Sequence, residues 1–130
     1  MNIAILIAGV LSLLAFVVHA FMGDKEHQRL KPDILSNDKI QEIWIQGRAA
    51  WHWLSVDLLL SGILLIIIST TELIEAKSEI SFLLALYFLI CGLVWFGALY
   101  FSKQKNQQFL SLGQWIFCFV MSGLIYFGAG

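Results

Sequence analysis

Residues 47–68 read GRAAWHWLSVDLLLSGILLIII. The first half of this stretch carries an arginine, a histidine, an aspartate and two tryptophans, whereas the second half is apolar apart from one serine and one glycine. An apolar run of ~20 residues is the length that an α-helix needs to cross the hydrocarbon core of a bilayer. The stretch therefore predicts a membrane-spanning helix whose ionisable groups all lie in its first half.

Three further apolar runs flank this one, and the four together predict spans at about residues 3–22, 49–68, 80–101 and 109–127. The chain is 59% hydrophobic and only 13% charged, unlike a soluble domain. No lysine or arginine precedes the first run, so we interpret it as a span rather than as a cleaved signal peptide. At 130 residues, the chain predicts a single integral-membrane domain. Its expected fold is an all-α, up-and-down four-helix transmembrane bundle.

The positive charges predict the orientation of this bundle. Among the eight lysines and arginines, only Lys77 falls in the middle connector at residues 69–79. The others lie in or beside the connectors at residues 23–42 and 102–108. Because short loops rich in Lys and Arg stay in the cytoplasm, both termini are predicted on the non-cytoplasmic side. Asp38, with Gln41 three residues later, resembles a capping pair that opens a helix ahead of the apolar run.

Polar side chains from several helices are expected at one depth near the cytoplasmic face. His19 and His52 each lie four residues inside from the cytoplasmic side, which is ~6 Å at 1.5 Å per residue. Arg48, His52 and Ser55 share one face of their helix, and Gln114 enters from the fourth run. Polar groups buried in lipid need partners. We therefore predict a hydrogen-bonded cluster of these five side chains.

Asp57 is the most deeply placed ionisable group. It lies nearly opposite Arg48 on the helical wheel and ~13 Å further along the axis, close to the predicted midplane. An aspartate there costs ~2.5–3.5 kcal/mol on the insertion scale, so it should be protonated, face water or pair with another helix or subunit. We include Asp57 in a candidate pathway for protons or small ions. The alternative interpretation is a structural interhelical hydrogen bond.

These observations leave three functions open. The leading hypothesis is a small accessory or oligomeric protein of the bacterial inner membrane, not an enzyme, whose polar cluster responds to or conducts protons or small ions. The second is an electron-transfer subunit in which His19 and His52 bind haem b or a metal ion, because bundle cofactor sites are built from facing helices. The third is a structural subunit of a larger membrane complex.

Other features point to packing and to lipid. The net charge of −1, with no basic face, gives no sign of nucleic-acid binding, so the expected partners are the bilayer and other membrane subunits. Trp51 and Trp53 flank His52 and are expected to pack against lipid or neighbouring helices. Cys91 and Cys118 lie inside apolar runs and are expected to behave as small hydrophobic side chains. No set of residues typical of a catalytic site is apparent.

Overall fold

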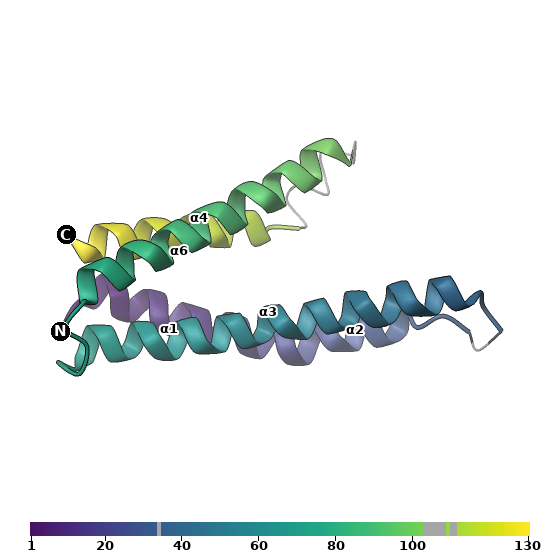
Figure 1. Ribbon diagram of the computed structural model, residues 1–130, viewed down its shortest axis with the longest axis horizontal. Helices are drawn as coiled ribbons and strands as arrows, with labels where there is room; N and C mark the ends of the chain where they lie inside the picture. Colours follow the sequence, from purple (N-terminus) through teal and green to yellow (C-terminus); the bar gives the residue numbers. More distant parts are fainter. Residues whose placement is uncertain (34, 103–108, 110–111) are drawn as a thin grey trace. The chain divides into compact units, whose positions relative to one another are not determined.

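The computed structural model describes residues 1–33, 35–102, 109 and 112–130. Within these residues all regular structure is helical, which confirms the predicted all-α class. Figure 1 shows the elements in chain order: α1 (Ile3–Val17), the π-helix η1 (Val18–Gly23), α2 (Asp24–Arg29), α3 (Asp38–Thr70), α4 (Lys77–Phe101) and α6 (Gln114–Ala129). Lys103 and Lys105, the two lysines of the predicted connector at residues 102–108, fall outside the described residues.

Three helices are long and apolar enough to cross a membrane. They are Ile3–Arg29, which joins α1, η1 and α2, together with α3 and α4, and they contain 27, 33 and 25 residues. Helix α6 has 16 residues, which at 1.5 Å per residue makes about 24 Å, less than the ~30 Å of a bilayer core. Length and composition thus indicate a membrane protein with three candidate spans. The apolar part of the first of these ends at Met22.

The polar connector predicted at residues 23–42 is largely helical. The first helix continues as α2 to Arg29, and α3 begins at Asp38, so only residues 30–37 join the two helices. The helix-opening residue is Asn37 rather than the predicted Asp38. Its side-chain Oδ1 accepts from the backbone N–H of Lys39 at 2.8 Å, and its carbonyl accepts from Ile40 N at 2.9 Å. Asparagine is among the best N-caps, because its oxygen satisfies an amide that the helix leaves unpaired.

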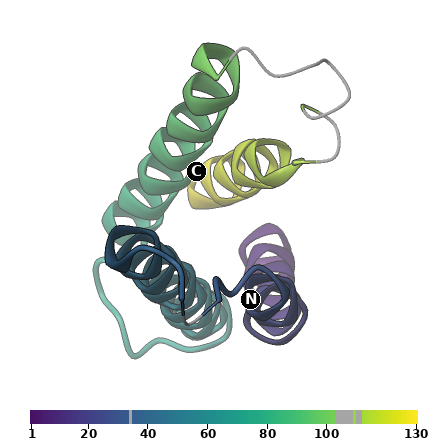
Figure 2. The same ribbon diagram turned by 90° about the vertical axis from the view of Figure 1, so that its right-hand side faces the viewer.

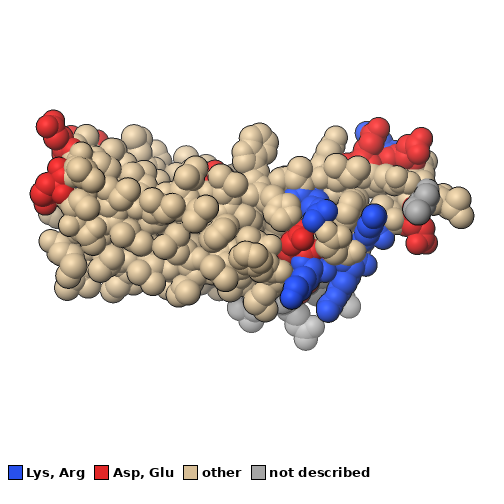
Figure 3. Space-filling view, turned by 90° about the horizontal axis from the view of Figure 1, so that it is seen from below, with Lys and Arg blue, Asp and Glu red and all other residues tan. Residues whose placement is uncertain are grey.

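Residues 9–64 form one compact unit, a helical hairpin. The arm made of α1, η1 and α2 runs antiparallel to α3 (Figure 1). In the apolar part of the hairpin the buried Ser12 hydroxyl donates to the Leu58 carbonyl at 2.7 Å. Gly62 allows the arms to approach closely, because a Cβ there would lie 2.7 Å from the Leu13 side chain. In Figure 3 charged side chains gather at the end of the hairpin that carries α2 and the start of α3.

The second compact unit contains residues 1–8 and 65–130. Its main contact is between α4 and α6, which run in opposite directions along the chain (Figure 1) and lie side by side (Figure 2). The buried Ser122 hydroxyl donates to the Ala85 carbonyl at 2.8 Å. Two turns further along α4, Gly92 leaves room for the Phe119 ring, which would lie 2.8 Å from an added Cβ. The start of α1 joins the end of α3 in this unit, where Asn2 N donates to the Ser69 carbonyl at 3.1 Å.

Candidate functional site

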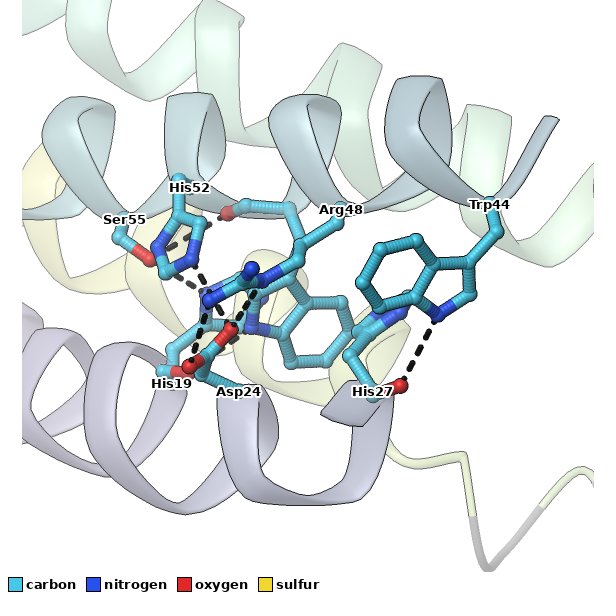
Figure 4. A network of polar contacts seen from close by, with 8 residues as sticks. His19, Asp24, His27, Trp44, Arg48, His52 and Ser55 are labelled. Carbon is cyan, nitrogen blue, oxygen red and sulfur yellow. Dashed lines mark hydrogen bonds and ion pairs between the residues drawn. The ribbon is translucent and has the colours of Figure 1, made fainter. Parts of the chain in front are cut away.

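One carboxylate joins the two arms of the hairpin (Figure 4). Asp24, the first residue of α2, receives Arg48 Nε on Oδ1 at 2.8 Å and Arg48 Nη2 on Oδ2 at 3.2 Å. The same Oδ1 lies 3.0 Å from His52 Nε2. We name Asp24, Arg48 and His52 the Asp24 cluster. Its guanidinium–carboxylate contact is bidentate, which adds both energy and directional specificity to the ion pair.

Helical spacing places the members of this cluster. Arg48 and His52 are four residues apart, so they lie one turn apart on the same face of α3. Asp24 faces them from the opposite arm, and its side chain is 23% exposed. Gln28, one turn beyond Asp24 in α2, brings its amide oxygen to 3.0 Å from Arg48 Nη1 in the orientation that satisfies both groups. The guanidinium is therefore held by two successive turns of the opposite arm.

The ionisation of Asp24 determines which nitrogen of His52 carries the proton in their hydrogen bond. Hydrogen bonding by Arg48 lowers the pKa of Asp24, which lies just past the apolar segment, from 3.8 to about 2. Asp24 is therefore ionised at neutral pH. An ionised carboxylate can only accept hydrogen bonds, so His52 must donate from Nε2. In the neutral ring this leaves Nδ1 as the atom that takes up a further proton.

A second pair of side chains lies beside the Asp24 cluster. The His19 ring stacks on the Trp51 indole, with ring centroids 3.8 Å apart and planes 7° from parallel. Trp51 Nε1 donates to the His19 carbonyl at 2.9 Å. The Ser55 hydroxyl is hydrogen-bonded to His19 Nδ1 at 2.9 Å and also lies 3.2 Å from the Trp51 carbonyl, so it connects His19 to α3. We name His19 and Trp51 the His19–Trp51 stack.

The π-helix η1 brings these two groups onto one face. His19 and Asp24 are five residues apart, and in an α-helix they would point ~140° away from each other. Hydrogen bonds of a π-helix join residues five apart, so the same two residues lie one above the other. Gly23 completes the fit, because a Cβ at this position would overlap the Trp51 indole. Single π-turns within α-helices are frequent at functional sites.

A tryptophan covers the outer edge of the Asp24 cluster. Trp44 Nε1 donates to the His27 carbonyl at 3.0 Å, which ties α3 to α2 a second time. The Arg48 guanidinium carbon lies 5.7 Å from the centroid of the Trp44 ring, within cation–π range. The His27 ring meets the Trp51 indole edge-on, with centroids 4.9 Å apart. Tryptophan rings thus contact the Arg48 guanidinium and the imidazoles of His19 and His27.

The structure brings together four of the six residues proposed from the sequence. His19, Arg48, His52 and Ser55 lie at the same end of the hairpin. Asp57 is half-buried in α3, two residues after Ser55 and thus ~200° around the helix from it. It occupies a different face from Ser55, as the helical wheel predicts.

The sixth proposed residue belongs to the other compact unit. Gln114 is the first residue of α6, in the unit of residues 1–8 and 65–130. Its Oε1 is buried and has no hydrogen-bond partner in the parts of the chain that the structure describes. A pathway for ions through these six residues stays a prediction.

Sequence reasoning missed the residue that joins the arms. Asp24 falls in the connector predicted at residues 23–42, and the sequence did not predict the short α2 that carries it. A signal was present, because Asp24, His27 and Gln28 are spaced as one helical face. The relation of that face to His19 depends on the π-turn, which an α-helical period does not predict.

The haem and metal hypotheses gain no support from the geometry. Among the residues that the structure describes, no group of three or more His, Cys, Asp or Glu side chains could hold a metal ion. Coordination by His52 through Nε2 would break its contact with Asp24. Each imidazole is instead hydrogen-bonded to a side chain of the opposite arm, His19 to Ser55 and His52 to Asp24.

Comparisons with known proteins do not place the chain in a family. It matches no protein-family model, no curated protein and no solved structure. A functional proposal therefore has to be built from the residues and contacts of this chain alone.

Proposed function

We propose that this chain is a small integral membrane protein whose Asp24 cluster, on the cytoplasmic side, responds to protons. The observation that carries the proposal is one ionised carboxylate bound at the same time by a permanent cation and by a histidine, at 2.8 and 3.0 Å. Histidine is the side chain that changes charge between about pH 5 and 8. Protonation of His52 converts its hydrogen bond to Asp24 into an ion pair, and so strengthens the link between the arms.

The groups that face His52 determine the sign of this effect. Asp24 attracts the protonated ring from 3.0 Å, whereas Arg48, one helical turn away on α3, repels it. His19 lies across the hairpin and is bound to Ser55 rather than to the carboxylate. Coulomb energy falls with distance, so the direct contact with Asp24 outweighs the more distant cation. Acidification is therefore expected to tighten the hairpin.

The membrane arrangement belongs to the same proposal. The three candidate spans and the apolar run at residues 109–127 would make a four-helix bundle. The excess of Lys and Arg in the first and third connectors supports a cytoplasmic location for these connectors, with both termini outside. The membrane of this proposal is the bacterial inner membrane.

Lipid and other subunits are the proposed partners. Within the chain, only 22% of the most apolar part of Ile3–Arg29 is buried. The same percentage applies to the most apolar part of Lys77–Phe101. So much exposed apolar surface must be covered by acyl chains or by other helices. These observations support assembly of the protein in the bilayer as a homo-oligomer or within a larger membrane complex.

Spin-label distances test the proton response. Labels at Glu26→Cys and Gln46→Cys, both exposed positions, report the separation of the arms once Cys91 and Cys118 are replaced by alanine. In lipid nanodiscs the distance distribution should narrow between about pH 8 and pH 5.5, the range over which histidines titrate. His52→Gln should abolish the change. His27→Gln is the matched control, because its ring contacts Trp51 rather than Asp24, and it should keep the response.

Two results would contradict the proposal: a wild-type distribution that does not depend on pH, or a pH response that survives His52→Gln. A different outcome would extend the proposal from a proton response to proton conduction, namely a proton flux in proteoliposomes that is lost in Asp57→Asn.

The haem hypothesis has its own test. It predicts a Soret band in the purified protein that disappears in both His19→Ala and His52→Ala.

A further inference from the structure

A hollow of about 360 Å³ lies within the unit of residues 1–8 and 65–130. Its walls come from the start of α1, the end of α3, the first turns of α4 and the end of α6. Ile5 and Ile68 provide apolar surface, and Lys77, Ser78 and Glu72 provide polar groups. The volume is in the range of small-molecule sites in proteins. The hollow shares no residue with the Asp24 cluster.

Ser81 makes this hollow a candidate binding site rather than a packing gap. It lines the hollow and is fully buried, yet its hydroxyl has no hydrogen-bond partner in the described part of the chain. A buried hydroxyl without a partner costs free energy, so such groups usually meet a bound molecule or water. Lys77 lies one turn earlier on α4, on the same face as Ser81. The α4 amino end has no side-chain cap, which leaves backbone N–H groups available.

The charges at the rim select the class of molecule. Lys77 Nζ lies 2.6 Å from Glu72 Oε2, in a pair whose Glu72 side chain is 93% exposed. A purely anionic molecule that bound Lys77 would leave Glu72 with only the amino-terminal ammonium group of Met1 as a neighbouring cation, and a purely cationic one would leave Lys77 without its anion. A molecule with one ammonium and one anionic group replaces the pair with two new ion pairs and leaves no charge unmatched.

We propose that the hollow binds a small zwitterion with a primary ammonium group and a phosphate or carboxylate group. The ammonium group binds Glu72, and the anionic group binds Lys77 and the open amino end of α4, within reach of the Ser81 hydroxyl. This chemistry is shared by the headgroup of phosphatidylethanolamine and by free solutes such as phosphoethanolamine. Ile5 and Ile68 belong to two candidate membrane spans, and the Glu72 side chain at the rim is 93% exposed.

Binding of phosphoethanolamine to the full-length protein in detergent, followed by calorimetry, tests the proposal. Wild type should bind it more tightly than inorganic phosphate or ethanolamine alone, since each of these satisfies one end only. Lys77→Gln and Ser81→Ala should each weaken binding about tenfold, the cost of losing one hydrogen bond to a charged group. Ser81→Ala should also leave the free protein as stable as wild type or more stable, since it removes a hydroxyl that has no partner.

Ser122→Ala is the matched control. This serine is also buried in the same unit, but it donates to the Ala85 carbonyl. Its loss should lower the stability of the free protein and leave phosphoethanolamine affinity unchanged. The proposal is overturned if wild type does not bind phosphoethanolamine, if phosphate alone binds equally well, or if Lys77→Gln and Ser81→Ala bind as wild type does.

Nanodiscs distinguish the two sources. If the natural occupant is the lipid headgroup, discs of phosphatidylethanolamine should compete with soluble phosphoethanolamine and weaken its apparent affinity. Discs of phosphatidylcholine should not, because its trimethylammonium group has no N–H to donate to Glu72. If the occupant is a free solute, the affinity should be the same in both kinds of disc. Either result supports a zwitterion site and identifies its source.

Discussion

Asp24 is the residue on which the ion-paired link between the arms depends. It stands directly after an apolar segment, where a carboxylate facing lipid would be costly, and it is compensated by Arg48 and His52. Both of its donors come from α3, so loss of the carboxylate leaves His52 without its acceptor and Arg48 with only the Gln28 amide oxygen. Removing one partner of a partly buried ion pair usually costs more than the pair itself contributes.

The lowered pKa of Asp24 predicts a specific acid sensitivity. A carboxyl group whose pKa falls from 3.8 to about 2 on folding stabilises the folded state above pH 3.8, and this contribution is lost as the pH falls through 2. Unfolding midpoints measured at successive pH values should therefore drop between about pH 4 and pH 2 in wild type. Asp24→Asn should be less stable at pH 6 and show a smaller acid drop. The exposed Asp33→Asn should follow wild type, and an unchanged acid drop in Asp24→Asn would contradict the prediction.

Two glycines on opposite arms predict opposite effects of the same substitution. Gly23→Ala would push a methyl group into the Trp51 indole and separate it from His19, with an overpacking cost of about 1–3 kcal/mol. Gly47 has open space around its Cβ position inside α3, so Gly47→Ala should stabilise the helix by up to ~1 kcal/mol. Denaturant unfolding in detergent measures both changes. Equal effects of the two substitutions would show that Gly23 is not a close-contact point.

At the scale of elements, the sequence predicts which residues share a face of α3 but does not predict the π-helix η1. The 3.6-residue period correctly groups Arg48, His52 and Ser55 on one face of α3 and puts Asp57 on another. The same period applied to the first helix places Asp24 and His19 on different faces, ~140° apart, whereas the π-helix places them on the same face. A π-turn depends on packing against the other arm, here Trp51 over Gly23, and so has no local sequence signal. Asn37 replaced Asp38 as the cap for a simpler reason, since both are good caps and helix ends are uncertain by one residue.

Changing the length of the π-turn tests its role directly. Deletion of Ala20 leaves His19 and Asp24 four residues apart, which a regular α-helix keeps on one face. Insertion of an alanine after Ala20 adds a further ~100° of rotation and should turn Asp24 away from Arg48. The deletion should therefore retain most of the thermal stability and the pH response of the spin-label distance, and the insertion should lose both. If the two variants behave alike, the phase of η1 does not position the cluster.

At the scale of the whole molecule, the apolar runs were sufficient to predict an all-helical chain with membrane-length helices. The last run, predicted at residues 109–127, lies partly outside the described residues, and the helix described within it, α6, begins at Gln114. Composition does not show that polar residues next to an apolar run continue its helix, as Asp24 to Arg29 do. Those residues form helix because they face Arg48 and Trp44 on the opposite arm.

Cysteine labelling tests the proposed orientation. Leu35 and Leu73 are 98% and 82% exposed and lie in the first and second connectors. With Cys91 and Cys118 replaced by alanine, Leu73→Cys should react with a membrane-impermeant maleimide on intact bacterial cells. Leu35→Cys should react only after the membrane is opened. The reverse pattern would place the Asp24 cluster on the outer side, and labelling of both positions on intact cells would count against any spanning arrangement of this hairpin.

The most direct test of the central claim is a double-mutant cycle of Asp24→Asn and His52→Gln, measured by reversible unfolding in one detergent at about pH 8 and pH 5.5. The cycle isolates the interaction between these two side chains from their separate contacts with Arg48 and solvent. The account predicts a favourable coupling that is larger at the lower pH, because a protonated imidazole and a carboxylate form an ion pair. A coupling that is absent, or that is the same at both pH values, would contradict a proton-responsive contact between Asp24 and His52.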